Sequence, residues 1–237
     1  RAEAWYAAAG ITLHACDPAV AIDRARGVLR LQSGRELPYG KLVLATGSRA
    51  RRLPQLAETL DNVVALRSSA DAQRLRERLV AATGVTVLGG GFIGLEVAAT
   101  ACGLGKTVTV LESAPRLLTR SVSPELAEHV LQTHRANGID LRLGVTVGGF
   151  EIEGDRLVAL TVDGQRESVD LLVLGIGATP ECRLAAEAGL ACDNGVVVDT
   201  CLRTADPAIL AIVNCAGFPA AGSGRQLRLG SGQNSKD

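Results

Sequence analysis

The sequence lacks any excess of charge and any apolar run long enough to cross a membrane. Its 237 residues carry 25 basic and 25 acidic side chains, so the formal net charge is zero. This balance offers no attraction to nucleic acid or to an anionic membrane surface, and we expect neither as a partner. No apolar run approaches the ~20 residues of a membrane span, and no signal-peptide pattern is present. We therefore expect a globular, cytoplasmic protein.

Methionine is absent altogether, and cysteine and histidine occur without the spacing of a metal site. The absence of methionine, even at position 1, predicts that the chain is a piece of a longer polypeptide. The cysteines show neither a C-x-x-C pair nor zinc-ligand spacing, and they lie at positions 16, 102, 182, 192, 201 and 215. The histidines at 14, 129 and 134 form no ligand pattern. We expect free thiols and no metal.

The sequence does contain a glycine motif in the setting of a dinucleotide-binding unit. Residues 85–88 are a β-branched run typical of a buried parallel strand, and Gly89, Gly91 and Gly94 follow as G-x-G-x-x-G. The first glycine permits a tight turn, the second lets a pyrophosphate approach the backbone, and the third lets the helix pack on the sheet. The helix N-terminus offers N–H groups to the phosphates.

A second strand and an acidic residue complete this unit. Residues 108–111 predict the strand, and Glu112 ends it, where a carboxylate can accept hydrogen bonds from a ribose 2′-OH. The same carboxylate would repel a 2′-phosphate, which predicts NADH in preference to NADPH. Arg116 and Arg120 follow closely and leave NADPH as the alternative, unless they are solvated charges. The alternative to a dinucleotide-binding site is a glycine-rich turn of an α/β domain that binds no ligand.

The chain also carries an internal repeat with an offset of about 130 residues. Each copy has, in order, a strand after a glycine, a hairpin, and an apolar strand that ends on glycine. In the first copy these lie at 10–14, 20–31 and 42–47, and in the second at 138–142, 147–162 and 171–177. The glycine motif and a helix that begins at Ser123 and Pro124 precede the second copy. The first copy therefore lacks its own glycine-rich loop.

We expect an α/β fold with two Rossmann-like dinucleotide-binding domains, each with a parallel sheet and a β-meander, the first incomplete. Residues 67–180 form the predicted NAD-binding domain, which begins with a helix capped by Ser68. Residues 1–66 and 181–237 form the incomplete domain. Its strand at 42–45 would lack a neighbour, and such an edge predicts a homodimer or aggregation.

With these features in place, the chain resembles the pyridine nucleotide-disulfide oxidoreductases, most closely the NADH-dependent ferredoxin, rubredoxin and putidaredoxin reductases. The resemblance runs along nearly the whole chain and is carried most specifically by residues 89–96, 111–118, 45–47 and 177–180. In that family an NAD domain interrupts an FAD domain, and an interface domain follows. The resemblance implies that the incomplete domain is the FAD domain, without its first βαβ unit and without the interface domain.

The resemblance also implies a reaction, in which NADH delivers hydride to flavin and flavin passes single electrons to a small iron–sulfur protein. It places Glu96 near the nicotinamide, although a helix N-terminus favours a carboxylate whatever its function. It assigns seven residues to NAD, namely Gly89, Gly91, Phe92, Ile93, Gly94, Glu112 and Gly177. It assigns four residues to FAD, namely Thr46, Gly47, Arg49 and Asn214, although Arg49 is equally typical of solvated surface.

Two segments depart from the family pattern on the flavin side. Where the resemblance leads one to expect Ala-Ile-Gly-Asp-Cys, the sequence has Val213 and Asn214 in place of the glycine and the aspartate. A β-branched valine adds two methyl groups where backbone must approach a phosphate, and the asparagine lacks the charge. Residues 229–235 carry two further glycines at flavin-side positions. We therefore predict that this chain alone does not hold FAD tightly.

Two functions from different classes follow from these residues. The first is a fragment of an FAD-dependent NADH:ferredoxin-type oxidoreductase, and the alternative is a flavin-free NAD-binding module without turnover. A classical dehydrogenase is disfavoured because no His or Lys stands in a catalytic setting. The disulfide-reductase branch stays open, because its cysteine pair lies early in the FAD domain, which this chain lacks.

Overall fold

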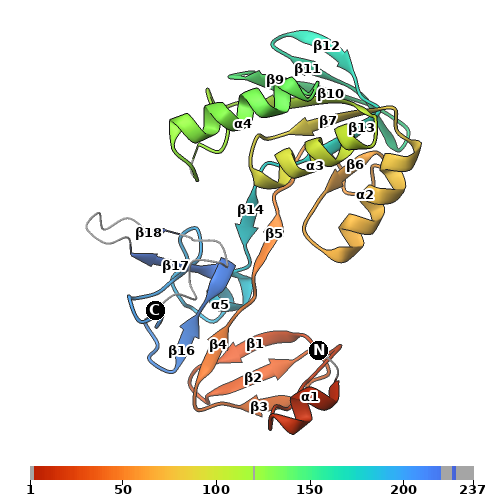
Figure 1. Cartoon of the computed structure of the whole chain (residues 1–237). Helices are drawn as coiled ribbons and strands as arrows, with labels where there is room; N and C mark the ends of the chain where they lie inside the picture. The colour runs from red at the N-terminus through yellow and green to blue at the C-terminus, as the bar shows by residue number, and fades with distance from the viewer. Residues whose placement is uncertain (1–2, 120, 220–225, 228–237) are drawn as a thin grey trace. The chain divides into compact units, whose positions relative to one another are not determined.

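The computed structural model describes residues 3–119, 121–219 and 226–227, which divide into two compact units (Figure 1). Unit 1 comprises residues 1–48 and 179–237, and unit 2 comprises residues 49–178. The chain passes between them in β5 (Ser48–Ala50) and β14 (Ala178–Pro180), which pair with each other. The first division lies earlier than the predicted 66/67 boundary, because residues 63–65 already form a strand of the unit 2 sheet.

Unit 2 is built on a five-stranded parallel sheet with the strand order β6-β13-β7-β8-β9. The strands are β6 (Val63–Ala65), β7 (Gly84–Leu88), β8 (Thr107–Glu112), β9 (Asp140–Leu143) and β13 (Leu171–Leu174). The predicted strands at 85–88 and 108–111 are therefore confirmed. The apolar runs bury both faces of the sheet, as a parallel sheet covered on both sides requires.

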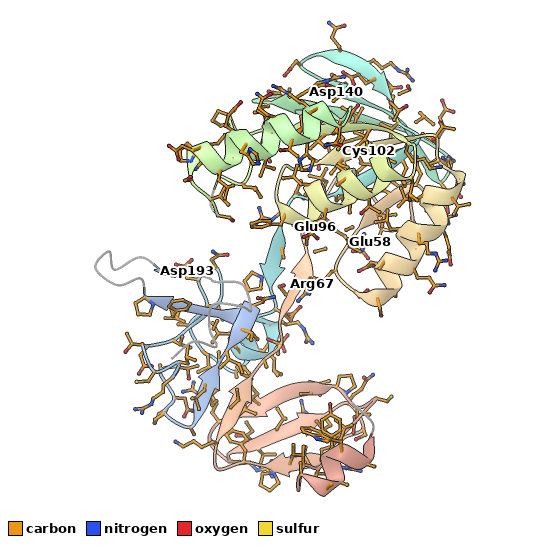
Figure 2. The ribbon with its side chains drawn as sticks, viewed as in Figure 1. Glu58, Arg67, Glu96, Cys102, Asp140 and Asp193 are labelled. Carbon is orange, nitrogen blue, oxygen red and sulfur yellow. The ribbon has the colours of Figure 1, made fainter. Side chains whose placement is uncertain are left out.

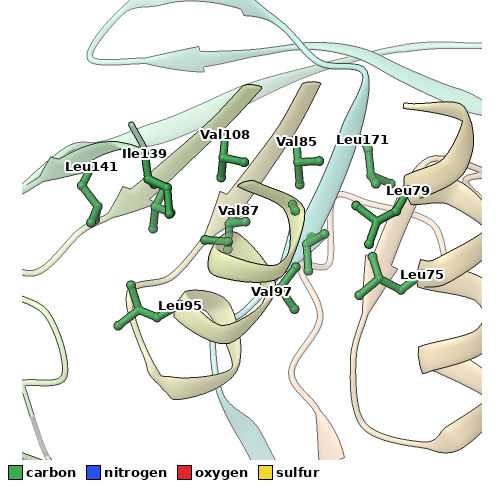
Figure 3. Close-up of a cluster of buried hydrophobic side chains, with 14 of the residues drawn as sticks. Leu75, Leu79, Val85, Val87, Leu95, Val97, Val108, Ile139, Leu141 and Leu171 are labelled. Carbon is green, nitrogen blue, oxygen red and sulfur yellow. The ribbon is translucent and has the colours of Figure 1, made fainter. Parts of the chain in front are cut away.

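Side chains alternate between two cores along each strand of this sheet. Leu171 and Val173 pack under the helices α2 (Ser69–Ala81), α3 (Phe92–Gly103) and α4 (Pro124–Ala136) (Figure 3). Leu172 and Leu174 pack on the opposite face against an antiparallel meander. The meander consists of β10 (Val147–Glu153), β11 (Arg156–Val162) and β12 (Gln165–Ser168).

The helix ends of unit 2 follow from their sequences. Ser68 and Asp71 form a reciprocal capping box at the start of α2. Ser123 accepts a hydrogen bond from the Leu126 N–H at the start of α4, with Pro124 at the first helical position. No helix within the described ranges is long and apolar enough to cross a membrane.

Unit 1 is an assembly of smaller sheets around a single apolar cluster. Its antiparallel meander contains β1 (Ala19–Asp23), β2 (Val28–Leu31) and β3 (Glu36–Pro38). Its two parallel pairs are β4 (Leu42–Leu44) with β16 (Ile209–Ala211), and β15 (Val196–Val197) with β17 (Ala216–Pro219). The remaining elements are α1 (Glu3–Ala8), α5 (Arg183–Glu187), a 3₁₀ turn (Val213–Cys215) and β18 (Gln226–Leu227), which pairs with β17.

The predicted strand at residues 10–14 is wrong, since these residues form no strand. Their counterpart in unit 2, β9, is a strand because it pairs with β8. No described strand of unit 1 pairs with residues 10–14, and Ile11 and Leu13 are 46% and 47% exposed. The apolar pattern alone does not form a strand where no neighbour supplies hydrogen bonds.

Candidate dinucleotide site of unit 2

The turn between β7 and α3 is held tightly by glycine packing. A Cβ built on Gly89 would lie 2.6 Å from the Gly175 carbonyl oxygen, and one on Gly94 would collide with the carbonyl oxygen of Gly89. Gly89 also has a φ of +102°, which a residue with a side chain rarely adopts. The two outer glycines of the motif therefore serve the turn and the contact between helix and sheet, as the sequence predicts.

Gly91 differs from its neighbours because a side chain built there would collide with nothing. The nearest atom to a Cβ at Gly91 is the Gly175 carbonyl oxygen, at an ordinary contact distance of 3.9 Å. Gly91 is the N-cap of α3, and no side chain caps this helix end. The first N–H groups of a helix have no partner within the helix, so their donors lie at this uncapped end. Uncapped backbone donors of this kind fit a phosphate group.

Two closely packed glycines beside the turn lie outside the G-x-G-x-x-G positions. A Cβ on Gly90 would collide with Leu117 and lie 3.3 Å from the Glu112 Oε2. Gly175, at the end of β13, lies so close that its Cβ would be 3.0 Å from the Gly94 Cα. The three consecutive glycines at 89–91 were the available signal for Gly90. No comparable signal exists for Gly175, because its constraint comes from a distant strand.

Glu112 is fixed against the glycine turn. Its Oε2 accepts a hydrogen bond from the Gly90 N–H at 2.6 Å, and its Oε1 accepts one from the Ala114 N–H at 2.7 Å. A carboxylate has about four acceptor positions, so capacity remains for a hydroxyl group. The side chain is half-buried at the end of β8. The structure thus joins the glycine motif and the acidic residue in one site.

Arg116 lies behind Glu112 but is held by the following loop. Its guanidinium donates to the Val122 and Thr119 carbonyl oxygens at 3.1 Å and 2.8 Å. The Leu118 N–H donates to the Gly90 carbonyl oxygen at 3.1 Å, so this loop also supports the glycine turn. Arg120 lies outside the described residues.

Four further candidates are exposed, three of them in the first turns of α3. Phe92 and Ile93 form its first turn and are 55% and 42% exposed. Glu96 lies one turn further along α3, with its side chain at the surface (Figure 2). Gly177 is exposed, with a φ of +94°, and follows β13 by three residues. Exposed apolar side chains beside uncapped backbone donors are typical of a surface that receives a ligand.

The flavin-side candidates of unit 1 form a separate group near the end of β4. The Thr46 hydroxyl donates to the Glu181 carbonyl oxygen at 2.6 Å, and the Gly47 carbonyl oxygen accepts from the Glu181 N–H at 2.9 Å. The 3₁₀ turn that contains Asn214 is joined to β4 by hydrogen bonds to the Leu44 carbonyl oxygen. Arg49 is exposed and belongs to unit 2.

Val213 has a φ of +52°, in the left-handed region that favours glycine. The conformation of this turn is thus the one that a glycine would adopt, although a β-branched residue occupies it. This observation disagrees with a flavin phosphate approaching the backbone at 213, because the valine side chain occupies the turn. The late segment 229–235 lies outside the described residues.

Comparison with known proteins finds reductases among the relatives of this chain. It is 41% identical over 235 residues to the putidaredoxin reductase of Pseudomonas putida, covering 97% of this chain and 56% of that protein. It is 43% identical over 215 residues to a rubredoxin-NAD(+) reductase of Ectopseudomonas oleovorans, covering 90% and 56%. The chain thus spans little more than half the length of these relatives.

Solved structures agree with this placement. A ferredoxin reductase from Rhodopseudomonas palustris superposes with a TM-score of 0.92 at 40% identity, covering 99% of this chain and 58% of that one. Putidaredoxin reductase in its covalent complex with putidaredoxin gives 0.90 at 40% identity, covering 99% and 58%. The α/β fold with Rossmann-like sheets is confirmed. The family model for pyridine nucleotide-disulphide oxidoreductases matches residues 6–234, and the chain belongs to that family.

Proposed function

We propose that unit 2 binds NADH at the turn between β7 and α3. The observation that carries this proposal is the contrast among the glycines, since a Cβ would collide with protein atoms at Gly89, Gly90 and Gly94 but not at Gly91. Gly91 lies at the uncapped N-terminus of α3, where the nicotinamide coenzyme's pyrophosphate would meet backbone N–H groups. Phe92, Ile93 and Gly177 would then border the coenzyme, with Glu96 nearest to the nicotinamide.

We propose NADH rather than NADPH because of Glu112. Its carboxylate is held by the Gly90 and Ala114 N–H groups, so it would meet the adenine ribose in a fixed position. It would accept from a free 2′-OH and repel a 2′-phosphate. Arg116 already donates to two carbonyl oxygens, so its guanidinium is committed to the loop that follows Glu112.

The reaction we propose for the family member that contains this chain is reduction of a small iron–sulfur or rubredoxin-type protein by NADH. Bound FAD would accept hydride and release single electrons, and the residues of this chain would position the nicotinamide. The names of two relatives, putidaredoxin reductase and rubredoxin-NAD(+) reductase, support such an acceptor class. The proposed location is the cytoplasm.

For the chain as it stands, one observation favours the second candidate, a flavin-free NAD-binding module. Val213 holds a glycine conformation with a branched side chain, and Asn214 beside it has no charge. The G-x-G-x-x-G motif of the 237-residue sequence belongs to unit 2, and the residues of unit 1 in this sequence contain no second such motif. Thr46 and Gly47 are engaged with Glu181.

An absorption experiment separates the two candidates. The purified chain is incubated with FAD, freed of excess, and examined for flavin bands before and after NADH. We expect no retained flavin, and partial recovery in a Val213→Gly, Asn214→Asp double variant. The matched control is Val197→Gly in β15, which changes a valine of unit 1 without restoring the turn. Flavin bands in the parent chain that are bleached by NADH would overturn the flavin-free assignment.

The association of two copies is a separate proposal. Val43 in β4 is 50% exposed although it lies in an apolar strand, and an apolar strand with an open side invites pairing with another chain. We expect light scattering to give a mass above that of one 24.5 kDa chain. A monomer across the concentration range would contradict it.

A further inference from the structure

Unit 1 brings Cys182 and Cys192 close together, although the sequence contains no C-x-x-C pair. Cys182 is the N-cap of α5, and Cys192 forms an isolated antiparallel bridge with Val196 just before β15. The Cys192 thiol donates to the Leu190 carbonyl oxygen at 3.6 Å and is 4.0 Å from the Cys182 carbonyl oxygen. The chain thus folds back so that the second thiol lies against the backbone of the first cysteine.

The two side chains also affect the ionisation of one another. Burial raises the pKa of Cys182 to about 12, and the neighbouring Cys192 and Cys215 contribute to that rise. Burial likewise raises the pKa of Cys192, partly offset by its hydrogen bond with the Cys182 side chain. Both groups are therefore protonated thiols at neutral pH. Cys192 is exposed and Cys182 is half-buried, so an oxidant in solution meets Cys192 first.

We propose that Cys182 and Cys192 are a redox-active pair that closes to a disulfide under peroxide. The Cys192 sulfur attacks a peroxide oxygen, the O–O bond breaks, and a sulfenic acid and one water result. The Cys182 sulfur then attacks the Cys192 sulfur, an S–S bond forms, and the S–O bond breaks to release a second water. Two thiols lose two electrons and two protons, and one hydrogen peroxide is reduced to two waters. The pair is independent of the proposed NADH site.

Cys215 does not compete for this bond. Its side chain is fully buried and its thiol donates to the Leu44 and Ile212 carbonyl oxygens at 3.3 Å and 3.1 Å. A metal site is not the better explanation, because the described part of the chain holds no group of three potential ligands. The remaining thiol near Cys182 that an oxidant can reach is Cys192.

The position of the pair gives the bond a consequence. Cys182 follows Glu181, whose backbone N–H and carbonyl oxygen are joined to Gly47 and Thr46. A disulfide would tether this segment to residue 192 and limit its motion beside the end of β4. Oxidation is therefore expected to reduce proteolytic cleavage and amide exchange at 181–192.

The test is peptide mapping of the full chain treated with hydrogen peroxide, with free thiols blocked before digestion. We expect a peptide that links residues 182 and 192, about 2 Da lighter than the two thiol peptides together. Because thiolate is the reacting form, the rate of linkage should rise about tenfold from pH 7 to pH 8. Reductant should restore both thiols.

Matched variants keep the assignment falsifiable. Cys192→Ser should abolish the link, and Cys201→Ser, at another exposed cysteine of unit 1, should leave it unchanged. If Cys192→Ser does not fold, the peptide map of the peroxide-treated parent chain still tests the proposal, because it shows whether residues 182 and 192 are linked. Sulfinic acid at Cys192 without a link, or a link from Cys192 to a different cysteine, would overturn the pair.

Discussion

The two copies of the internal repeat have similar sequences, and each contains a meander, but their first segments differ in structure. Residues 139–141 read Ile-Asp-Leu and enter β9, where Ile139 and Leu141 are buried beside β8. Residues 11–13 read Ile-Thr-Leu, form no strand, and leave both apolar side chains about half exposed. The difference teaches that a strand of a parallel sheet depends on its neighbour for hydrogen bonds and burial.

The same contrast distinguishes the two ligand regions. In unit 2 the glycine turn, Gly175 and Glu112 fix one another through backbone contacts. In unit 1 the turn after β16 contains Val213 in a left-handed conformation. The glycines of unit 2 therefore agree with the backbone of their turn, whereas in unit 1 a branched side chain occupies a conformation that favours glycine.

The largest effect is expected from disrupting the glycine turn of unit 2. Gly94→Ala would place a methyl group against the Gly89 carbonyl oxygen, so the free energy of unfolding of unit 2 should fall by about 3 kcal/mol and NADH binding should be lost. Urea unfolding and a fluorescence titration measure both. Gly103→Ala is the control in the same helix, because nothing lies within 4 Å of its Cβ. Equal losses in both variants would contradict the packing argument.

The next effect concerns the choice of coenzyme. Glu112→Gln keeps the shape but removes the charge, so the affinity for NADH should fall about tenfold and the gap to NADPH should narrow. Titration with both coenzymes measures this change. Glu128→Gln alters an exposed carboxylate of α4 and should have no effect on either coenzyme. Identical titration curves for NADH and NADPH in the parent chain would refute the role of Glu112.

A smaller effect involves pH and the sheet of unit 2. Burial alone would raise the pKa of Asp170. Hydrogen bonds from the Thr83 and Gly84 N–H groups and from the Thr83 hydroxyl outweigh this effect, so the pKa lies below its ordinary value of 3.8. The carboxylate therefore stabilises the fold above pH 3.8, and this contribution is lost as pH falls through the lowered folded-state value.

Asp170→Asn should lower the free energy of unfolding by about 1 kcal/mol at pH 7 and flatten its dependence on pH in the acid range. Urea unfolding at a series of pH values measures both effects. Asp155→Asn, at an exposed hairpin position, provides the control. A parent chain whose stability rises as the pH falls below 3.8 would disprove the sign of the argument.

The smallest effect is expected in the turn at residue 213 of unit 1. Val213→Gly should change the free energy of unfolding by less than about 0.5 kcal/mol, because relief of left-handed strain offsets the lost side chain. Val197→Gly removes a half-buried valine from β15, where no strain is relieved, and should cost about 1–2 kcal/mol. Thermal unfolding of the two variants measures the difference. Equal costs would mean that the turn at 213 carries no strain.

Local patterns predicted the helices and strands of unit 2, and in unit 1 they predicted the hairpin at 20–31 and the strand that begins at residue 42. Capping residues at Ser68 and Ser123 and the β-branched runs located the helices and strands of unit 2, because each element has its neighbours within the chain. Gly175 escaped prediction because its constraint is a contact with Gly94, far away in sequence. The prediction of a strand at 10–14 was wrong because these residues have the apolar pattern of a strand but no pairing partner among the described residues.

The most direct test of the account is a titration of the flavin-free chain with NADH, followed by coenzyme fluorescence, with Gly94→Ala in parallel. We predict saturable binding of about one NADH per chain to the parent in the absence of flavin, and none to the variant. An absence of saturable binding to the parent, or equal binding to both, would contradict the claim that unit 2 carries a complete NADH site.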